Sequence, residues 1–114
     1  MGSDQADRIA MGRIAGTARR YATAGLDGEL DRADAVGALR RVSGGRADLL
    51  AEHAGLCLGY ALARPGPHAA IRRLEAELCI EAGADRGLIP AWRQTGYFRA
   101  LAGGDVTNGP PGGP

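Results

Sequence analysis

Apolar residues recur at helical spacing along most of the chain, and short breaks that contain glycine or proline separate the segments. A period near 3.6 residues predicts amphipathic helices, and no segment has the period-2 alternation of a strand. The breaks place four main helices at 4–24, 31–42, 46–64 and 68–82, and a shorter fifth at 90–102. The Gly/Pro-rich residues 103–114 are expected to form a disordered tail. The sequence therefore predicts an all-α fold, a compact bundle in which residues 1–102 form a single helical domain.

The third of these helices differs from the others because it is apolar nearly all round. A helix that is apolar on most sides is buried on most sides, so we expect residues 46–64 at the centre of the fold. The break after it is short, Arg64-Pro65-Gly66-Pro67. A turn of that length makes the helices at 46–64 and 68–82 a central antiparallel hairpin.

Small residues recur at every fourth position on two of the predicted helices. The positions are Gly12 and Gly16 on the first helix and Ala51, Gly55, Gly59 and Ala63 on the third. Residues four apart share one helix face, and each interior glycine costs a helix about 1 kcal/mol relative to alanine. We therefore interpret both stripes as sites of close helix packing, inside one subunit or across a dimer.

The composition indicates a thin core. Alanine supplies 22 of the 114 residues, whereas Leu, Ile, Val and Phe together number 21. A domain of this size buries limited apolar surface alone, so we expect a homo-oligomer or a protein partner to supply the rest.

Charge and hydropathy argue against nucleic acid and membranes as partners. The net charge of +1 gives no general attraction to nucleic acid or anionic lipid. The longest uncharged apolar stretch, residues 54–63, is too short to cross a bilayer, and no signal-peptide pattern is present. We therefore expect no membrane association, a cytoplasmic location and two cysteines that remain thiols.

Four residues on the predicted hairpin are of metal-binding types. If the turn centres on Gly66, His53 lies level with Cys79, and Cys57 lies level with Glu75. An H-x-x-x-C pattern then faces an E-x-x-x-C pattern, which is a donor set for zinc. The same register offsets the two cysteines by about 6 Å along the axis, which argues against a disulfide. The alternative is that both cysteines are small buried hydrophobic residues and that His53 lies on a wetter strip.

Glu75 is unusual because it projects into the apolar face of its helix, between Ile71 and Leu78, whereas Arg72 is expected to point outward. A buried carboxylate needs a partner, and His53 or an arginine of the first helix could serve. An acid/base or ligand role is the other interpretation. The chain offers no Ser/His/Asp set, second carboxylate or phosphate loop from which to build a catalytic mechanism, so a non-enzymatic role is favoured.

A helix-turn-helix interpretation is available for residues 31–64. It would bring Arg40, Arg41 and Arg46 near phosphates. A recognition helix needs a polar face, however, and the helix at 46–64 becomes apolar within a turn. Nucleic acid is therefore a disfavoured partner.

The predicted fifth helix carries three of the five aromatic residues of the chain but no clean inner face. Aromatic residues and arginine are enriched in interfaces. The candidate docking residues are Trp92, Arg93, Tyr97, Phe98 and Leu101. In the alternative interpretation, Trp92 and Phe98 cap the core from opposite sides.

These patterns support two main functional hypotheses and a third that is less favoured. The first is a small cytosolic interaction or regulatory protein that docks through its helices to itself or to a protein partner. The second is a metal- or small-ligand-binding accessory protein that uses a pocket around His53, Cys57, Glu75 and Cys79, with zinc as the candidate cofactor. Helix-turn-helix DNA binding is the third.

Overall fold

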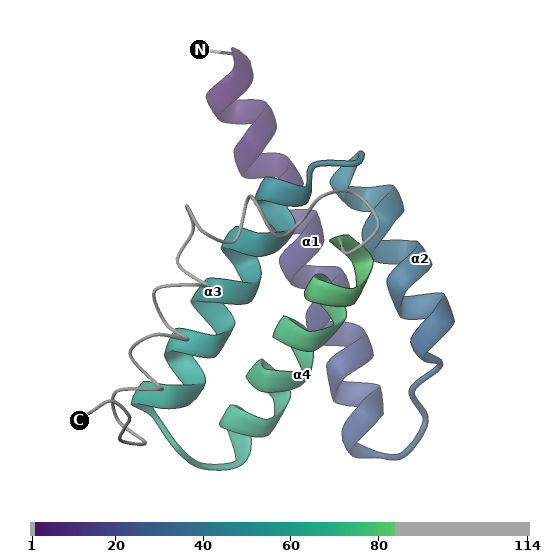
Figure 1. Ribbon diagram of the computed structural model, residues 1–114, viewed down its shortest axis with the longest axis vertical. Coiled ribbons are helices and arrows are strands. Elements are labelled where there is room, and N and C mark those ends of the chain that lie inside the picture. The colour runs from purple at the N-terminus through teal and green to yellow at the C-terminus, as the bar shows by residue number, and fades with distance from the viewer. Residues whose placement is uncertain (1, 84–114) are drawn as a thin grey trace, which may run out of the picture.

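The computed structural model describes residues 2–83, and it folds them into four α-helices (Figure 1). The helices are α1 (Gly2–Leu26), α2 (Arg32–Ser43), α3 (Ala47–Ala63) and α4 (Pro67–Gly83). Their bounds lie within two residues of those predicted, and the described residues contain no strand, which confirms the all-α bundle. The helix expected at 90–102 and the tail expected at 103–114 lie outside the described residues.

Local sequence signals explain where the helices begin and end. The side chain of Asp31 caps α2 by accepting a hydrogen bond from the backbone N–H of Asp34 at 3.1 Å. Gly44 ends α2 in the left-handed conformation at φ 59°, which suits a residue without a Cβ. Pro67 is the first residue of α4, where its missing N–H leaves no intrahelical bond unmade.

The predicted hairpin of α3 and α4 is confirmed, but α4 rather than α3 takes the central position. The two helices lie side by side and antiparallel, and α4 also packs against α1 and α2 (Figure 1). Helix α3 makes only limited contact with α2. Among the apolar residues on its outer side, Leu56 is 59% exposed and Leu62 39% exposed. The apolar character of α3 therefore does not place it at the centre of the bundle.

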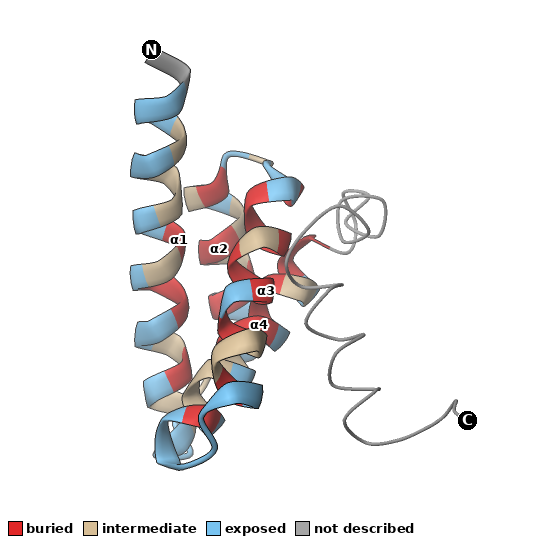
Figure 2. Ribbon diagram, turned by 90° about the vertical axis from the view of Figure 1, so that its left-hand side faces the viewer, coloured by how far each residue is buried: buried red, intermediate tan, exposed pale blue. Residues whose placement is uncertain are grey.

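The core among the described residues is small and rich in alanine, as the composition predicted. Side chains on the inner faces of the helices are buried, while the outer face of α1 is exposed along its length (Figure 2). The largest fully buried apolar side chains are Ile14, Leu39, Leu50 and Leu78. Much of the remaining core consists of alanines, among them Ala18, Ala22, Ala35, Ala51, Ala54 and Ala82.

The glycine stripe of α1 does not form a close helix crossing inside the subunit. Gly12 and Gly16 are exposed, and a Cβ added at either would meet no atom of another described residue within 4 Å. Ile14, Thr17 and Ala18, which lie between or beside these glycines in the sequence, are buried, so Gly12 and Gly16 lie on a face of α1 that is turned away from the core. Instead, α1 approaches a neighbour closely at Gly25, where an added Cβ would strike Cδ2 of Leu74 on α4.

The small residues of α3 differ from those of α1 in burial. Ala51 and Gly55 are buried, Gly59 is half-buried and Ala63 is exposed. Close packing along this stripe, and a crossing of α1 between two copies of the chain, stay predictions.

Candidate functional site

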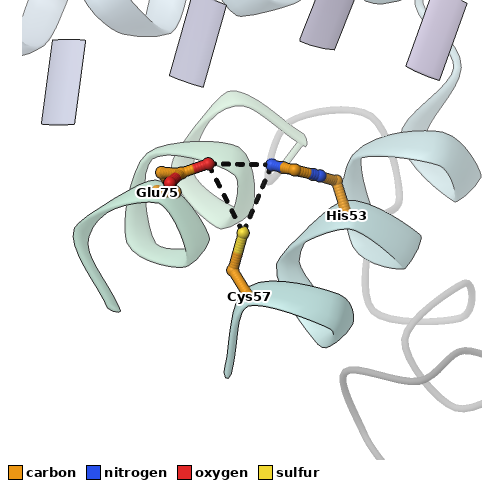
Figure 3. A group of neighbouring side chains, drawn as sticks. All are labelled: His53, Cys57 and Glu75. Atoms are coloured by element: carbon orange, nitrogen blue, oxygen red, sulfur yellow. Dashed lines mark hydrogen bonds and ion pairs between the residues drawn. The ribbon is translucent and has the colours of Figure 1, made fainter. Parts of the chain in front are cut away.

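Three of the four predicted ligand residues meet in the interior, where α3 faces α4 (Figure 3). His53 and Cys57 lie one turn apart on α3, and Glu75 reaches them from α4. Cys57 contacts Glu75, the residue predicted to lie level with it, whereas His53 contacts Glu75 instead of Cys79, its own predicted counterpart. The exposed fractions of His53, Cys57 and Glu75 are 5%, 1% and 0%, so all three are buried.

The donor atoms of these residues form a small triangle. His53 Nε2 lies 3.1 Å from Glu75 Oε1, and Cys57 Sγ lies 3.2 Å from the same nitrogen. Cys57 Sγ lies 3.5 Å from Glu75 Oε1. Three different side chains from two helices thus direct one nitrogen, one oxygen and one sulfur at a common point (Figure 3). We call His53, Cys57 and Glu75 the donor triangle.

The fourth predicted ligand, Cys79, does not join the donor triangle. Cys79 is fully buried in the apolar core and is a free cysteine, like Cys57. The α4 residue that contacts both His53 and Cys57 is Glu75, which lies one helical turn before Cys79. Both cysteines are thiols, as predicted.

The second carboxylate oxygen of Glu75 faces two arginines. Arg19 Nε of α1 donates to Oε2 at 2.8 Å, and Arg72 Nη1 of α4 lies 3.5 Å from the same oxygen. Both partners that the sequence suggested for Glu75, His53 and an arginine of the first helix, are therefore present. Arg72 was expected to point outward; it instead lies near the site, with Nη1 3.9 Å from Cys57 Sγ. Sequence reasoning missed this because the helical projection treats a long side chain as a fixed direction.

Burial and charge set the protonation of the donor triangle. Burial, and then the neighbouring Glu75 carboxylate, raise the pKa of the Cys57 thiol to about 12, although Arg72 opposes the shift. Burial alone would raise the pKa of Glu75, but the hydrogen bonds from His53 and Arg19 outweigh it and hold the pKa below its ordinary value. At neutral pH the site therefore contains a carboxylate beside a neutral thiol.

This arrangement does not form a cysteine–histidine–acid relay. In such a relay the acid holds one imidazole nitrogen while the thiol uses the other. Here Cys57 Sγ and Glu75 Oε1 both contact Nε2 of His53. Among the described residues, Nδ1 of His53 makes no hydrogen bond. The raised pKa of Cys57 also keeps the thiol from becoming a nucleophile at neutral pH.

A shared point of contact is, in contrast, what metal ligands provide. Zinc binds nitrogen and oxygen at about 2.0 to 2.1 Å and sulfur at about 2.3 Å, so two ligand atoms of a tetrahedral site lie about 3.3 to 3.6 Å apart. The edges of the donor triangle, 3.1, 3.2 and 3.5 Å, are close to these separations. Because two of its edges are shorter than about 3.3 Å, the triangle is slightly smaller than one face of a zinc tetrahedron.

Two of the three arginines of the helix-turn-helix interpretation, Arg40 and Arg46, contact groups of the protein itself. Arg46 donates to Asp7 and to Asp48, both at 2.9 Å, and Arg40 Nε donates to the carbonyl oxygen of Ala82 at 2.9 Å. A DNA complex would have to compete with these contacts.

All five predicted docking residues lie outside the described residues; they are Trp92, Arg93, Tyr97, Phe98 and Leu101. Within residues 2–83, no helix combines the length and the apolar character that a membrane span requires.

The chemistry of the site is defined by three donor atoms and two arginines. The donor triangle supplies nitrogen, oxygen and sulfur atoms at defined separations, and Arg19 and Arg72 fix the outer oxygen of its carboxylate. Comparison of the chain with protein-family models, with curated proteins and with solved structures gave no match.

Proposed function

We propose that this chain is a small helical metal-binding protein that holds one zinc ion on His53, Cys57 and Glu75. The observation that carries the proposal is the donor triangle: three buried donor atoms of different side chains with edges of 3.1 to 3.5 Å. Zinc accepts this mixture of imidazole, thiolate and carboxylate ligands. Three protein ligands leave a fourth position for water or an exogenous ligand, which suits an accessory or carrier role.

Zinc binding would change the charges of the site by one proton. Zinc binding requires the thiol of Cys57 to lose its proton. The thiolate and the carboxylate of Glu75 then neutralise the charge of the ion. Arg19 and Arg72 contact Oε2 of Glu75, so Oε1 stays directed at the common point. In metal sites, outer hydrogen bonds of this kind orient the ligating carboxylate.

The chain offers a matched pair of variants for the test, because Cys57 and Cys79 are both buried free cysteines. Native mass spectrometry of wild-type protein with one equivalent of Zn²⁺ should give one bound ion per chain. The Cys79→Ser variant should bind in the same way, whereas Cys57→Ser should lose most of the bound zinc. With Co²⁺ in place of zinc, wild type and Cys79→Ser should show a thiolate-to-cobalt charge-transfer band that Cys57→Ser lacks.

Two outcomes would contradict the proposal. Folded wild-type protein that takes up no zinc or cobalt at one equivalent has no metal site. Equal loss of the ion in both cysteine variants would show that binding does not depend on the donor triangle.

As a second candidate function we propose docking of a second copy through α1. The support is an exposed face of α1, where Ile9 is 51% exposed and Gly12 and Gly16 have open space above them. The first turns of the same helix extend beyond the bundle (Figure 2). Glycines on an exposed face allow two helix backbones to approach closely, and an exposed isoleucine beside them adds apolar contact.

Gly16→Leu tests this docking without disturbing the subunit, because an added Cβ meets nothing within 4 Å. Sedimentation velocity should give a dimer for wild type and a monomer for Gly16→Leu, with unchanged helical circular dichroism in both. A wild-type monomer at the highest soluble concentration would contradict the second candidate and leave the zinc proposal untouched.

A further inference from the structure

A pocket opens on the surface beside the donor triangle, and three helices line it. Its volume is about 440 Å³. Its lining combines small and apolar residues with an aromatic ring, an imidazole and a guanidinium: Met11, Gly12 and Ala15 of α1, His53, Leu56 and Tyr60 of α3, and Arg72 of α4. An apolar concave surface with a few convergent polar groups is the usual form of a small-molecule site, and this volume lies within the usual range.

The small residues of α1 keep this pocket open. Gly12 has no side chain, and an added Cβ there would meet no atom of another described residue within 4 Å. Ala15, almost one turn later, lines the same space with a single methyl group. The glycine that the sequence placed at a close helix crossing therefore borders the pocket instead.

The charge around the pocket is positive. Arg19 and Arg72 both face the single carboxylate of Glu75, Arg19 at 2.8 Å and Arg72 at 3.5 Å. Two guanidinium charges thus face one carboxylate charge, which leaves a net positive charge among Arg19, Arg72 and Glu75. Arg72 is the arginine that lines the pocket, and its guanidinium carbon lies 4.9 Å from the centre of the Tyr60 ring. The ring restricts the guanidinium by a cation–π contact while edge N–H groups remain available to a ligand.

A buried imidazole gives the second observation that indicates a ligand. His53 is 5% exposed and lines the pocket, and both of its hydrogen-bond contacts use Nε2. Within residues 2–83, its Nδ1 has no hydrogen-bond partner. Nε2 donates to the Glu75 carboxylate, which leaves Nδ1 as the acceptor of the ring. Buried polar atoms are normally satisfied, so this unpartnered nitrogen of a pocket-lining residue favours an N–H or O–H donor of a bound molecule.

We propose that this pocket binds a small organic carboxylate. The carboxylate pairs with the guanidinium of Arg72, whose planar N–H groups match its two oxygens. The apolar part of the ligand lies against Met11, Ala15 and Leu56. A single ring or a short alkyl chain fits the volume. This binding goes beyond the proposed zinc site and needs no metal.

The experiment uses benzoate as the probe and the full chain after removal of metal with EDTA. Titration followed by ¹H–¹⁵N NMR should shift amide signals of residues 11–15 and 56–60. Benzamide, which has the same size and no charge, should bind about tenfold more weakly or worse, because a hydrogen bond to a charged group is worth more than a neutral one. Arg72→Gln should weaken benzoate binding by a similar factor, whereas Arg73→Gln, at an exposed neighbouring position, should not change it.

A second variant fills the pocket without removing a charge. Gly12→Leu should keep the fold, because its Cβ enters open space, and should abolish the benzoate shifts. Absence of shifts in wild type, equal binding of benzamide, or full binding by Gly12→Leu would each overturn the proposal. Zinc binding by the same preparation is measured separately, so failure of the pocket and failure of the metal site are distinguishable.

Discussion

The two cysteines of the hairpin offer a comparison in which residue type and burial are held constant. Cys57 is 1% exposed and Cys79 0%, and burial is the largest cause that raises the pKa of each thiol. Cys57 contacts His53 and Glu75, whereas Cys79 makes no hydrogen bond to any residue that the structure describes. Both cysteines belong to one buried cluster, and the difference lies in their hydrogen-bond partners. We call the hydrogen-bonded surroundings of Cys57 the polar region and the surroundings of Cys79 the apolar region.

The two regions are expected to contribute differently to stability. The core around Cys79 is formed by apolar groups such as Leu50 and Leu78, whose burial stabilises the fold directly. The region around Cys57 contains a buried carboxylate, and burying a charge is unfavourable unless partners compensate for it. The region around Cys57 is therefore expected to contribute less net stability than the apolar core.

The largest predicted effect comes from the apolar region. Leu50 is fully buried, so Leu50→Ala removes apolar contacts and leaves a cavity; the free energy of unfolding should fall by about 3 kcal/mol. Leu56→Ala is the control, because Leu56 is 59% exposed, and it should change stability by less than about 0.5 kcal/mol. Urea denaturation followed by circular dichroism measures both. Equal losses would mean that the apolar region does not dominate stability.

A smaller effect is expected from the carboxylate of the polar region. At pH 7, Glu75→Gln removes the charge that Arg19 and His53 contact, and the free energy of unfolding should fall by about 2 kcal/mol. The pKa of Glu75 is lower in the folded state than its ordinary value of 4.5. The ionised carboxylate therefore stabilises the fold above about pH 4.5, and this contribution is lost as pH falls through the folded-state pKa.

The pH dependence distinguishes this mechanism from a simple packing defect. Denaturation at pH 7 and at pH 3 should show that the difference between wild type and Glu75→Gln shrinks in acid. Glu77→Gln serves as the control: Glu77 is 59% exposed in its contact with Arg32 and should matter little at either pH. A loss of the same size at both pH values would contradict the assigned role of the Glu75 charge.

The same comparison shows which features the sequence could reveal. The contact between Cys57 and Glu75, the burial of Glu75 and its two kinds of partner follow from residues that recur every three or four positions, because such residues share a face. The central helix of the bundle was harder to predict from the sequence. Helix α3 is the most apolar helix, but α4 packs against the other three. The number of faces that a helix buries depends on how the helices are arranged, and one-dimensional apolarity does not contain that arrangement.

Gly12 and Arg72 show a second limit of sequence reasoning. Gly12 lies at the same four-residue spacing as a close-packing stripe, but no neighbouring helix presses against it and the position borders a pocket. Arg72 falls on the outward face by projection, and its long side chain nevertheless contacts Glu75 and Tyr60. Spacing gives the direction of a Cβ atom, but not what occupies the space beyond it or how far a long side chain extends.

The smallest predicted effect is a direct test of the two cysteines. Replacing sulfur with oxygen leaves nearly the same shape but adds a hydroxyl that needs a hydrogen-bond partner. In Cys79→Ser the hydroxyl lies in an apolar region, and the free energy of unfolding should fall by about 1 kcal/mol. In Cys57→Ser the hydroxyl can donate to Glu75 Oε1, so metal-free stability should change by less than about 0.5 kcal/mol.

The order of these two losses matters more than their size, and urea denaturation of metal-free protein measures it. If Cys57→Ser is the less stable variant, the polar neighbours of Cys57 do not satisfy a hydroxyl, and the donor triangle does not function as a hydrogen-bonded unit. With zinc present the order should reverse, because only Cys57→Ser loses a ligand and an ion bound to the folded state stabilises it. A reversal that depends on zinc would place the metal at Cys57, since the two variants carry the same chemical change on neighbouring helices.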